Sequence, residues 1–327
     1  MSTRRQILRS ALGLAGAMAL APHALAQALT KPVKVIVGFP AGGGTDIIAR
    51  VLADRLRGAY AETVVVENKP GGAARLSVEF VKNAEPDGTT ILVTPDFPLT
   101  VYPHSFRTLS YDPLKDVTPV APITRSLLTF NVGPGVPESV KTVADFVAWC
   151  KANPSKSSYG TTAAGSTTHF AGAMLSAAAG VPMQAVHYRG GAPALQDLLG
   201  GHIPASVNPV SEAMPLANQG QLRILAVTGS RRSKFLPNVP TLKEAGYDVV
   251  VDSWIGVFAP ANMPANRVAA LSKAIETAVK SPEYASSLAK FGNEPDFEAP
   301  DAFAKRFRAD VAKWGPVVKA SGFVAQD

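Results

Sequence analysis

Residues 33–46 have the sequence VKVIVGFPAGGGTD, and this stretch indicates the fold. Its first seven residues are apolar or small apart from Lys34, which is typical of a buried strand. Pro40 and three glycines end that strand, and Thr45 and Asp46 can cap a helix that runs to about Arg57. A strand, a glycine turn and a helix in this order predict a βαβ-type unit of an α/β fold.

The same order recurs along the chain. We expect further strands near residues 63–67, 89–94, 157–160, 183–188, 203–207 and 222–227. A capping-box pattern at Thr142 and Asp145 predicts a helix that ends near Asn153. Further helices are expected near residues 169–179, 193–199, 265–280, 282–290 and 300–320. The pattern predicts mostly parallel sheets in two α/β lobes of similar size.

The last helices need a sheet to cover, so both chain ends are expected in one lobe, which requires two crossings between lobes. We place these crossings near residues 127 and 247, and the apolar segment 254–258 is a candidate crossing strand. Residues 27–127 and 247–327 then form one lobe, and residues 128–246 form the other.

Composition excludes several classes of protein. Apolar residues make up 46% of the 327 and charged residues 17%, a balance opposite to that of disordered chains. The net charge of +7 is reduced when residues 1–26 are set aside, and the remaining basic residues are scattered along the sequence, so we expect no nucleic-acid partner.

Cys150 is the single cysteine, which excludes an intramolecular disulfide framework. His187 and His202 lack ligand spacing, so we expect no metal site.

The first 26 residues have the three parts of an export signal. Arg4, Arg5 and Arg9 form a basic start, residues 11–21 are uncharged and mostly apolar, and residues 24–26 form an A-x-A cleavage site. The arginine pair resembles a twin-arginine signal, and the general secretory route stays open. We expect a periplasmic protein, cleaved near Ala26.

Glycine-rich or small polar turns follow four of the expected strands, at residues 40–46, 68–73, 160–168 and 189–193. In open α/β sheets such turns gather at the carboxyl ends of the strands, where ligands bind. Helix N-termini there present free N–H groups and partial positive charge, which suits an anion. No phosphate-binding glycine motif is present, so a carboxylate is expected rather than a nucleotide.

Several polar residues in these turns have two interpretations each. Asp46 either accepts a hydrogen bond from a ligand or caps its helix, and Ser166 and Thr167 either donate to a carboxylate or cap the helix near residue 169. Arg189 is the one fixed positive charge among the turns, and it is either a ligand contact or a solvated side chain. Ser166 and His169 also permit an exported Ser/His hydrolase or transferase, although no orienting acid is near in sequence, and we therefore predict no catalytic residues.

The chain resembles the Bug-type extracytoplasmic solute receptors of tripartite tricarboxylate transporters. The resemblance extends over essentially all of the chain that follows the signal. It is carried by FPAGGGTD at 39–46, ENKPGG at 67–72, PDG at 86–88, YDPLKD at 111–116, YRGGAP at 188–193, DLLGG at 197–201, VPT at 239–241 and GVFAP at 256–260. Each motif is weak alone, and their order and spacing carry the similarity.

The resemblance implies a two-lobed periplasmic binding protein fold of the type with two hinge crossings, no catalysis and no cofactor. Such receptors close over a carboxylate and deliver it to the membrane components of a tripartite transporter, and hinge closure needs no dimer, so a monomer is expected. The family holds its carboxylate with loops that match residues 39–46, 161–168 and 189–193 here. The expected ligand contacts are Phe39, Gly43, Gly44, Thr45, Asp46, Thr94, Asp96, Phe97, Thr161, Thr162, Ser166, Thr167, His169, Arg189, Gly190, Ala192, Pro193 and Asn208.

Three departures from the family pattern bear on the ligand. The stretch 94–100 is bulky, Arg189 stands where lysine is also common, and Asn208-Pro209 replaces a more acidic segment. Phe39 and Phe97 could flank a flat ring, so an aromatic and an aliphatic mono- or dicarboxylate both stay open. A solute sensor that reports to a membrane partner is a further alternative.

Overall fold

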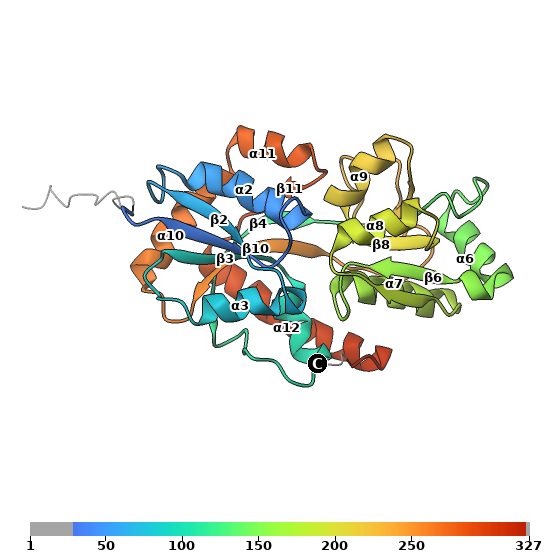
Figure 1. Cartoon of the computed structure of the whole chain (residues 1–327), viewed down its shortest axis with the longest axis horizontal. Helices are drawn as coiled ribbons and strands as arrows, with labels where there is room; N and C mark the ends of the chain where they lie inside the picture. Colours follow the sequence, from blue (N-terminus) through green and yellow to red (C-terminus); the bar gives the residue numbers. More distant parts are fainter. Residues whose placement is uncertain (1–28, 325–327) are drawn as a thin grey trace, which may run out of the picture.

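The computed structural model describes residues 29–324, so the expected export signal at residues 1–26 lies outside the described chain. Two sheets, each covered by helices, lie end to end along the long axis of the molecule (Figure 1). We call the part built on the six-stranded sheet lobe 1 and the part built on the five-stranded sheet lobe 2. Within residues 29–324, no helix is both long and apolar enough to cross a membrane.

Lobe 1 has the strand order β11-β4-β10-β3-β1-β2. The strands are β1 (Val33–Val37), β2 (Val64–Asn68), β3 (Thr90–Pro95), β4 (Val117–Ser126), β10 (Ser253–Pro260) and β11 (Glu294–Pro295). The helices are α2 (Gly44–Leu56), α3 (Arg75–Lys82), α4 (Phe97–Thr100), α5 (Tyr102–Ser105), α10 (Ala265–Val279), α11 (Pro282–Ala289) and α12 (Pro300–Ser321), with a 3-10 turn at Gly72–Ala74. Buried aliphatic side chains on both faces of this sheet pack against these helices.

Lobe 2 has the strand order β7-β6-β8-β5-β9. The strands are β5 (Leu128–Val132), β6 (Ser158–Thr161), β7 (Gln184–His187), β8 (Ala205–Pro209) and β9 (Arg223–Val227). The helices are α6 (Val143–Ala152), α7 (Thr167–Ala179), α8 (Gly191–Leu199) and α9 (Val210–Asn218), with a 3-10 turn at Pro154–Lys156. The capping box expected before α6 is present, because the side chains of Thr142 and Asp145 each accept a backbone N–H of the other.

The expectation of mostly parallel sheets is wrong at the centre of the molecule. Strand β10 is antiparallel to both β3 and β4, and β5 is antiparallel to both β8 and β9. Strand β4 was not expected, because Pro119 and Pro122 interrupt its apolar pattern. The structure accommodates both prolines at register shifts of the β4–β10 pair, where Gly256 lies opposite Pro122 and Phe258 lies opposite Pro119.

The chain passes between the lobes twice. It leaves lobe 1 after Ser126, at the end of β4, and enters β5 at Leu128. It leaves lobe 2 after β9 and enters lobe 1 again at Ser253, the first residue of β10. The segment 254–258 therefore lies within a strand of lobe 1.

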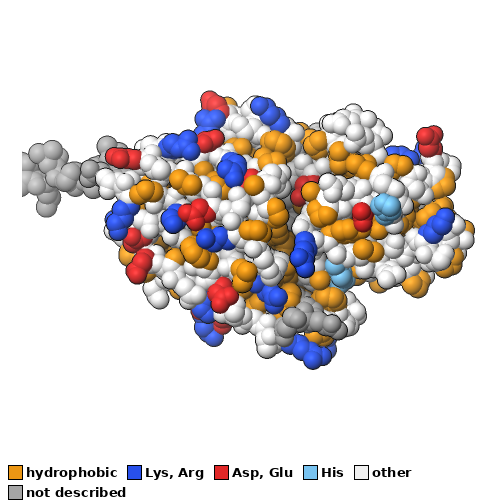
Figure 2. All heavy atoms as spheres, viewed as in Figure 1, with side chains coloured by type: hydrophobic (Ala, Val, Ile, Leu, Met, Phe, Trp, Pro, Cys, Tyr) orange, Lys and Arg blue, Asp and Glu red, His pale blue; other side chains and the backbone are white. Residues whose placement is uncertain are grey.

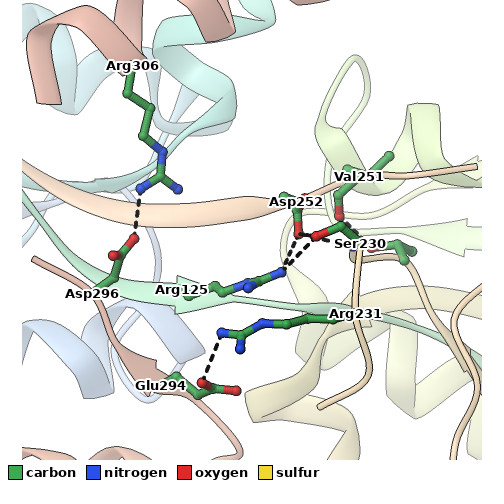
Figure 3. A network of polar contacts seen from close by, with 9 residues as sticks. Arg125, Ser230, Arg231, Val251, Asp252, Glu294, Asp296 and Arg306 are labelled. Carbon is green, nitrogen blue, oxygen red and sulfur yellow. Dashed lines mark hydrogen bonds and ion pairs between the residues drawn. The ribbon is translucent and has the colours of Figure 1, made fainter. Parts of the chain in front are cut away.

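A polar network joins the two crossing segments to each other (Figure 3). The Arg125 guanidinium lies 2.7 Å from an oxygen of Asp252, and that oxygen also accepts the backbone N–H of Ser230 at 3.2 Å. Beside it, Arg231 of the second crossing lies 3.4 Å from Glu294 of lobe 1. These contacts hold the two crossings side by side (Figure 3).

Helix α12 belongs to both lobes. Its first half buries Phe303 and Phe307 against the sheet of lobe 1. Its second half places Trp314 and Val318 in the core of lobe 2, where the Trp314 ring lies 6.0 Å from Phe170 of α7. The last helix therefore forms a third connection between the lobes, made by packing rather than by the chain.

Candidate functional site

A cavity of about 230 Å³ lies between the two lobes, where β1, β3, β6, β7 and β8 end. In the face shown in Figure 2 the two halves meet along a groove bordered by hydrophobic side chains. Lobe 1 lines the cavity with residues 39–45, Pro95, Phe97, Ser126, Ser253 and Ile255. Lobe 2 lines it with Leu128, Thr162, Thr167, Thr168, residues 189–193, Pro209, Ser211 and Glu212.

Four helices begin at the wall of this cavity. Their N-cap residues are Gly43 for α2, Ser166 for α7, Gly190 for α8 and Pro209 for α9. The N–H groups of a first helical turn have no partner within the helix, and each N-terminus carries about half a positive charge. Arg189 is the one basic residue in the lining. The site therefore has the donors and the field that bind an anion.

The backbone conformation of Gly190 sets the direction in which α8 starts at the cavity. Gly190 has a φ of +114°, a conformation that side-chain-bearing residues rarely adopt, and its N–H donates to the carbonyl of Thr162 at 2.8 Å. The turn thus connects the ends of β6 and β7 before α8 begins at Gly191.

The structure brings many of the expected ligand contacts to the cavity wall. Those that line it are Phe39, Gly43, Gly44, Thr45, Phe97, Thr162, Thr167, Arg189, Gly190, Ala192 and Pro193. The others lie behind the wall, where their side chains bond to the protein itself. These are Asp46, Thr94, Asp96, Thr161, Ser166, His169 and Asn208.

Asp46 holds the loop before α2 in shape. Its carboxylate accepts hydrogen bonds from the backbone of Gly42 at 2.9 Å, from Arg50 at 2.9 Å and from the Asn68 amide at 2.8 Å. Burial by itself would raise the pKa of Asp46, but these three donors outweigh it and hold the pKa below its usual value. Asp46 therefore positions the glycine loop, and its oxygens are occupied by this chain.

We expect Asp46→Asn to lower the free energy of unfolding by about 2 kcal/mol at pH 7, the size of the lost hydrogen bonds to a charged group. Because the native pKa is depressed, the contribution is present above the unfolded value of 3.8 and is lost as the pH falls through the native pKa. The difference between variant and wild type should therefore shrink below pH 4, which urea titrations at pH 7, 4 and 3 measure.

Asp54→Asn is the matched control, because Asp54 lies on the same helix with its side chain 67% exposed and should change stability by less than about 0.5 kcal/mol. A difference for Asp46→Asn that does not vary with pH would contradict the ionised role of Asp46.

Ser166 and His169 do not form a nucleophile and base. The Ser166 hydroxyl is fully buried, donates to the carbonyl of Ala163 at 2.7 Å and accepts the backbone N–H of His169 at 3.3 Å. The His169 ring instead faces the Gly165 N–H, and burial together with His187 lowers its pKa to about 4. Of the two interpretations of Ser166, the structure shows the helix cap.

Asp96 and Thr94 lie beneath the floor of the cavity. One oxygen of Asp96 accepts the hydroxyl of Ser253 at 2.9 Å, and Ser253 lines the cavity. Burial raises the pKa of Asp96 to about 7, and the charge of Asp310 acts in the same direction. Thr94 is fully buried and donates to the carbonyl of Pro95.

Thr161 and Asn208 lie at the ends of two lobe 2 strands. The Thr161 hydroxyl contacts the carbonyl of Ala163 at 3.2 Å and Nδ1 of His187 at 3.0 Å. The Asn208 amide donates to Glu212 at 3.2 Å, which fixes a side chain that does line the cavity.

Phe39 and Phe97 contact each other directly. Their ring centroids lie 6.0 Å apart at an interplanar angle of 66°, an edge-to-face pair. A flat ligand ring between two stacked side chains needs about twice the 3.5 Å contact distance. In this arrangement no flat ring fits between Phe39 and Phe97, and the two side chains form one apolar wall.

A family model described as "Tripartite tricarboxylate transporter family receptor" matches residues 48–323. The chain belongs to this family. It is 30% identical over 294 residues to BugT of Bordetella pertussis, which covers 89% of this chain and 90% of BugT. The protein is thus one of a family of solute-binding receptors, not of enzymes.

Two solved structures share this fold closely. R. palustris Rpa4515 with adipate gives a TM-score of 0.85 at 31% identity and covers 90% of this chain and 98% of that one. MatC (Rpa3494) from Rhodopseudomonas palustris with bound malate gives 0.80 at 27% identity and covers 88% and 98%. These comparisons confirm the two-lobed α/β fold and the Bug-type resemblance expected from the motifs.

The sequence of this tripartite tricarboxylate receptor did not point to several cavity residues. They are Ser126, Leu128, Ser211, Glu212, Ser253 and Ile255. Four of them flank the crossings, and Ser211 and Glu212 lie in the first turn of α9. The available signal was Asn208-Pro209, which ends β8 and starts α9, but α9 was not expected. Within residues 29–324, no cluster of histidine, cysteine or carboxylate side chains is suited to a metal.

Proposed function

We propose that this protein captures a small aliphatic organic carboxylate between its lobes in the periplasm and delivers it to the membrane components of a tripartite tricarboxylate-type transporter. The observation that carries this proposal is the convergence of four helix N-termini and Arg189 on one interlobe cavity. A carboxylate suits these donors because backbone N–H groups bind it without a lysine.

Lobe closure is the mechanism that this site supports. We take residues 27–127 with 247–327 and residues 128–246 as the two moving units, since β4–β5 and β9–β10 connect the sheets. A ligand that contacts donors of both lobes favours the closed arrangement by its differential affinity for it. Adipate and malate in the two solved relatives, and the direct contact of Phe39 with Phe97, favour an aliphatic ligand here.

The proposal predicts that aliphatic carboxylates stabilise the purified protein. A ligand at 100 times its dissociation constant should add about 2.7 kcal/mol to the free energy of unfolding. A thermal-shift screen of mono-, di- and tricarboxylates with two to six carbons, together with benzene carboxylates, measures this. The protein should be unfolded, dialysed and refolded first, so that any bound cellular solute is removed.

The corresponding carboxamides are the matched control, because they keep the shape and remove the charge. Equal shifts by acids and carboxamides would contradict anion recognition by helix N-termini. A folded, stripped protein that no carboxylate stabilises would overturn the proposed function.

A further inference from the structure

Glu212 is the one acidic residue that lines the cavity, and it bridges the two lobes. It lies in the first turn of α9 in lobe 2 and accepts hydrogen bonds from the Asn208 amide at 3.2 Å and from the backbone N–H of Gly44 in lobe 1. Its carboxylate also packs onto Gly191, where an added Cβ would lie 1.6 Å from Oε2. The N-termini of α2, α8 and α9 thus surround one carboxylate of the protein itself.

This carboxylate has no cationic partner. No lysine, arginine or histidine within residues 29–324 lies at ion-pair distance from Glu212, and its two hydrogen bonds come from neutral donors. Burial raises the pKa of Glu212 despite these two donors. An ionised carboxylate can accept about four hydrogen bonds, so acceptor capacity remains on a side chain that faces the cavity.

Glu212 brings a carboxyl group without a cationic partner into an anion cavity, and this limits what a ligand can place beside it. One end of the ligand can be a carboxylate held by the one remaining helix N-terminus, that of α7, and by Arg189. A second carboxylate close to Glu212 could not be ionised together with it in a poorly solvated site, because like charges at short range are strongly unfavourable. A cationic or hydrogen-bond-donating group there would offset the burial of the Glu212 charge.

We propose that Glu212 makes this receptor select a monocarboxylate whose opposite end is an ammonium or another hydrogen-bond donor, and discriminate against a dicarboxylate of equal length. The inference rests on the proposed function and narrows its substrate class. It separates this chain from the relatives whose structures hold adipate and malate, both of which are dicarboxylates.

The test compares two ligand series by calorimetry on stripped protein. One series is the ω-amino acids with two to five methylene groups, and the other is the dicarboxylates with the same numbers of methylenes. Wild-type protein should bind the best ω-amino acid at least tenfold more tightly than its matched dicarboxylate. Glu212→Gln should weaken the ω-amino acid about thirtyfold, the effect of removing one partner of a buried charge pair, and should strengthen the dicarboxylate.

Glutamine keeps an oxygen that can accept from Asn208 and Gly44, so the fold of the variant should be retained, and its melting temperature checks this. Glu283→Gln on α11 is the control for net charge, because Glu283 is exposed and outside the cavity, and it should leave both series unchanged.

Two outcomes overturn the inference in distinguishable ways. If wild type prefers dicarboxylates and Glu212→Gln preserves that preference, Glu212 does not set selectivity, although the receptor function stands. If neither series binds to wild type or variant, and the wider carboxylate screen is also negative, the receptor function falls together with the inference.

Discussion

Replacing Gly44 with alanine is expected to weaken carboxylate binding by roughly ten- to a hundredfold while leaving the ligand-free protein folded. Gly44 is the first residue of α2 in lobe 1, and a Cβ built there lies 2.6 Å from the hydroxyl oxygen of Ser211 in lobe 2. Overpacking at a fitted contact costs about 1–3 kcal/mol, and that cost falls on an arrangement of the lobes that brings the two residues together, which is the one that a ligand spanning the cavity would favour. Calorimetry on wild type and variant, with whichever carboxylate gives the largest thermal shift, measures the loss.

A double-mutant cycle distinguishes a lobe contact from damage to α2. Ser211→Ala removes the hydroxyl that the new Cβ meets, so Gly44→Ala should have little effect when it is made in the Ser211→Ala background. An undiminished loss of affinity in that background would show that Gly44 acts on the ligand or on its own loop. X-ray scattering should show a larger radius of gyration for the single variant in the presence of ligand.

Asp96→Asn is expected to raise the free energy of unfolding at pH 8 by up to about 4 kcal/mol. The pKa of Asp96 is about 7 in the native state against 3.8 for an exposed carboxyl, and each unit is worth about 1.36 kcal/mol. Between these two values the unfolded chain loses its proton while the native protein keeps it, so wild-type stability falls as the pH rises from 4 to 7. Asparagine cannot ionise, so the variant avoids this loss.

Urea titrations from pH 4 to pH 8 test this sign. The variant and wild type should have similar stabilities near pH 4 and diverge above it, with the variant the more stable at pH 8. Asp301→Asn, an exposed position on α12, should show no such divergence. A variant that is less stable than wild type at pH 8 would show that the ionised carboxylate is favourable in its buried position.

The glycine turns that line the cavity in lobe 1 and lobe 2 could be predicted from the sequence, because the residues that indicate each turn lie close together in the chain. An apolar run, a glycine turn and a helix start lie within fifteen residues of each other around Gly43, and the same is true around Gly190. The sequence left two roles open for Ser166. Only the structure shows that its hydroxyl donates a hydrogen bond to the carbonyl of Ala163 and accepts the N–H of His169 as a helix cap.

The missing parts depend on contacts between distant segments. Glu212 is 168 positions from Gly44, and no local pattern indicates that the two meet across the cavity. Strand β4 was hidden because Pro119 and Pro122 are unfavourable in most strands, and the register shifts that admit them belong to β10, more than 130 residues away. The direction of β10 follows from the return crossing, which sequence periodicity does not encode.

The packing of α12 across the lobes gives the molecule an internal optical reporter. The chain has three tryptophans, and one of them, Trp314, lies on the part of α12 that packs against Phe170 of lobe 2. Trp254 on β10 packs against Phe303 and Phe307 within lobe 1 and donates its indole N–H to Asp310. A rotation of one lobe against the other changes the surroundings of the Trp314 indole, so intrinsic emission can follow closure in real time without an attached dye.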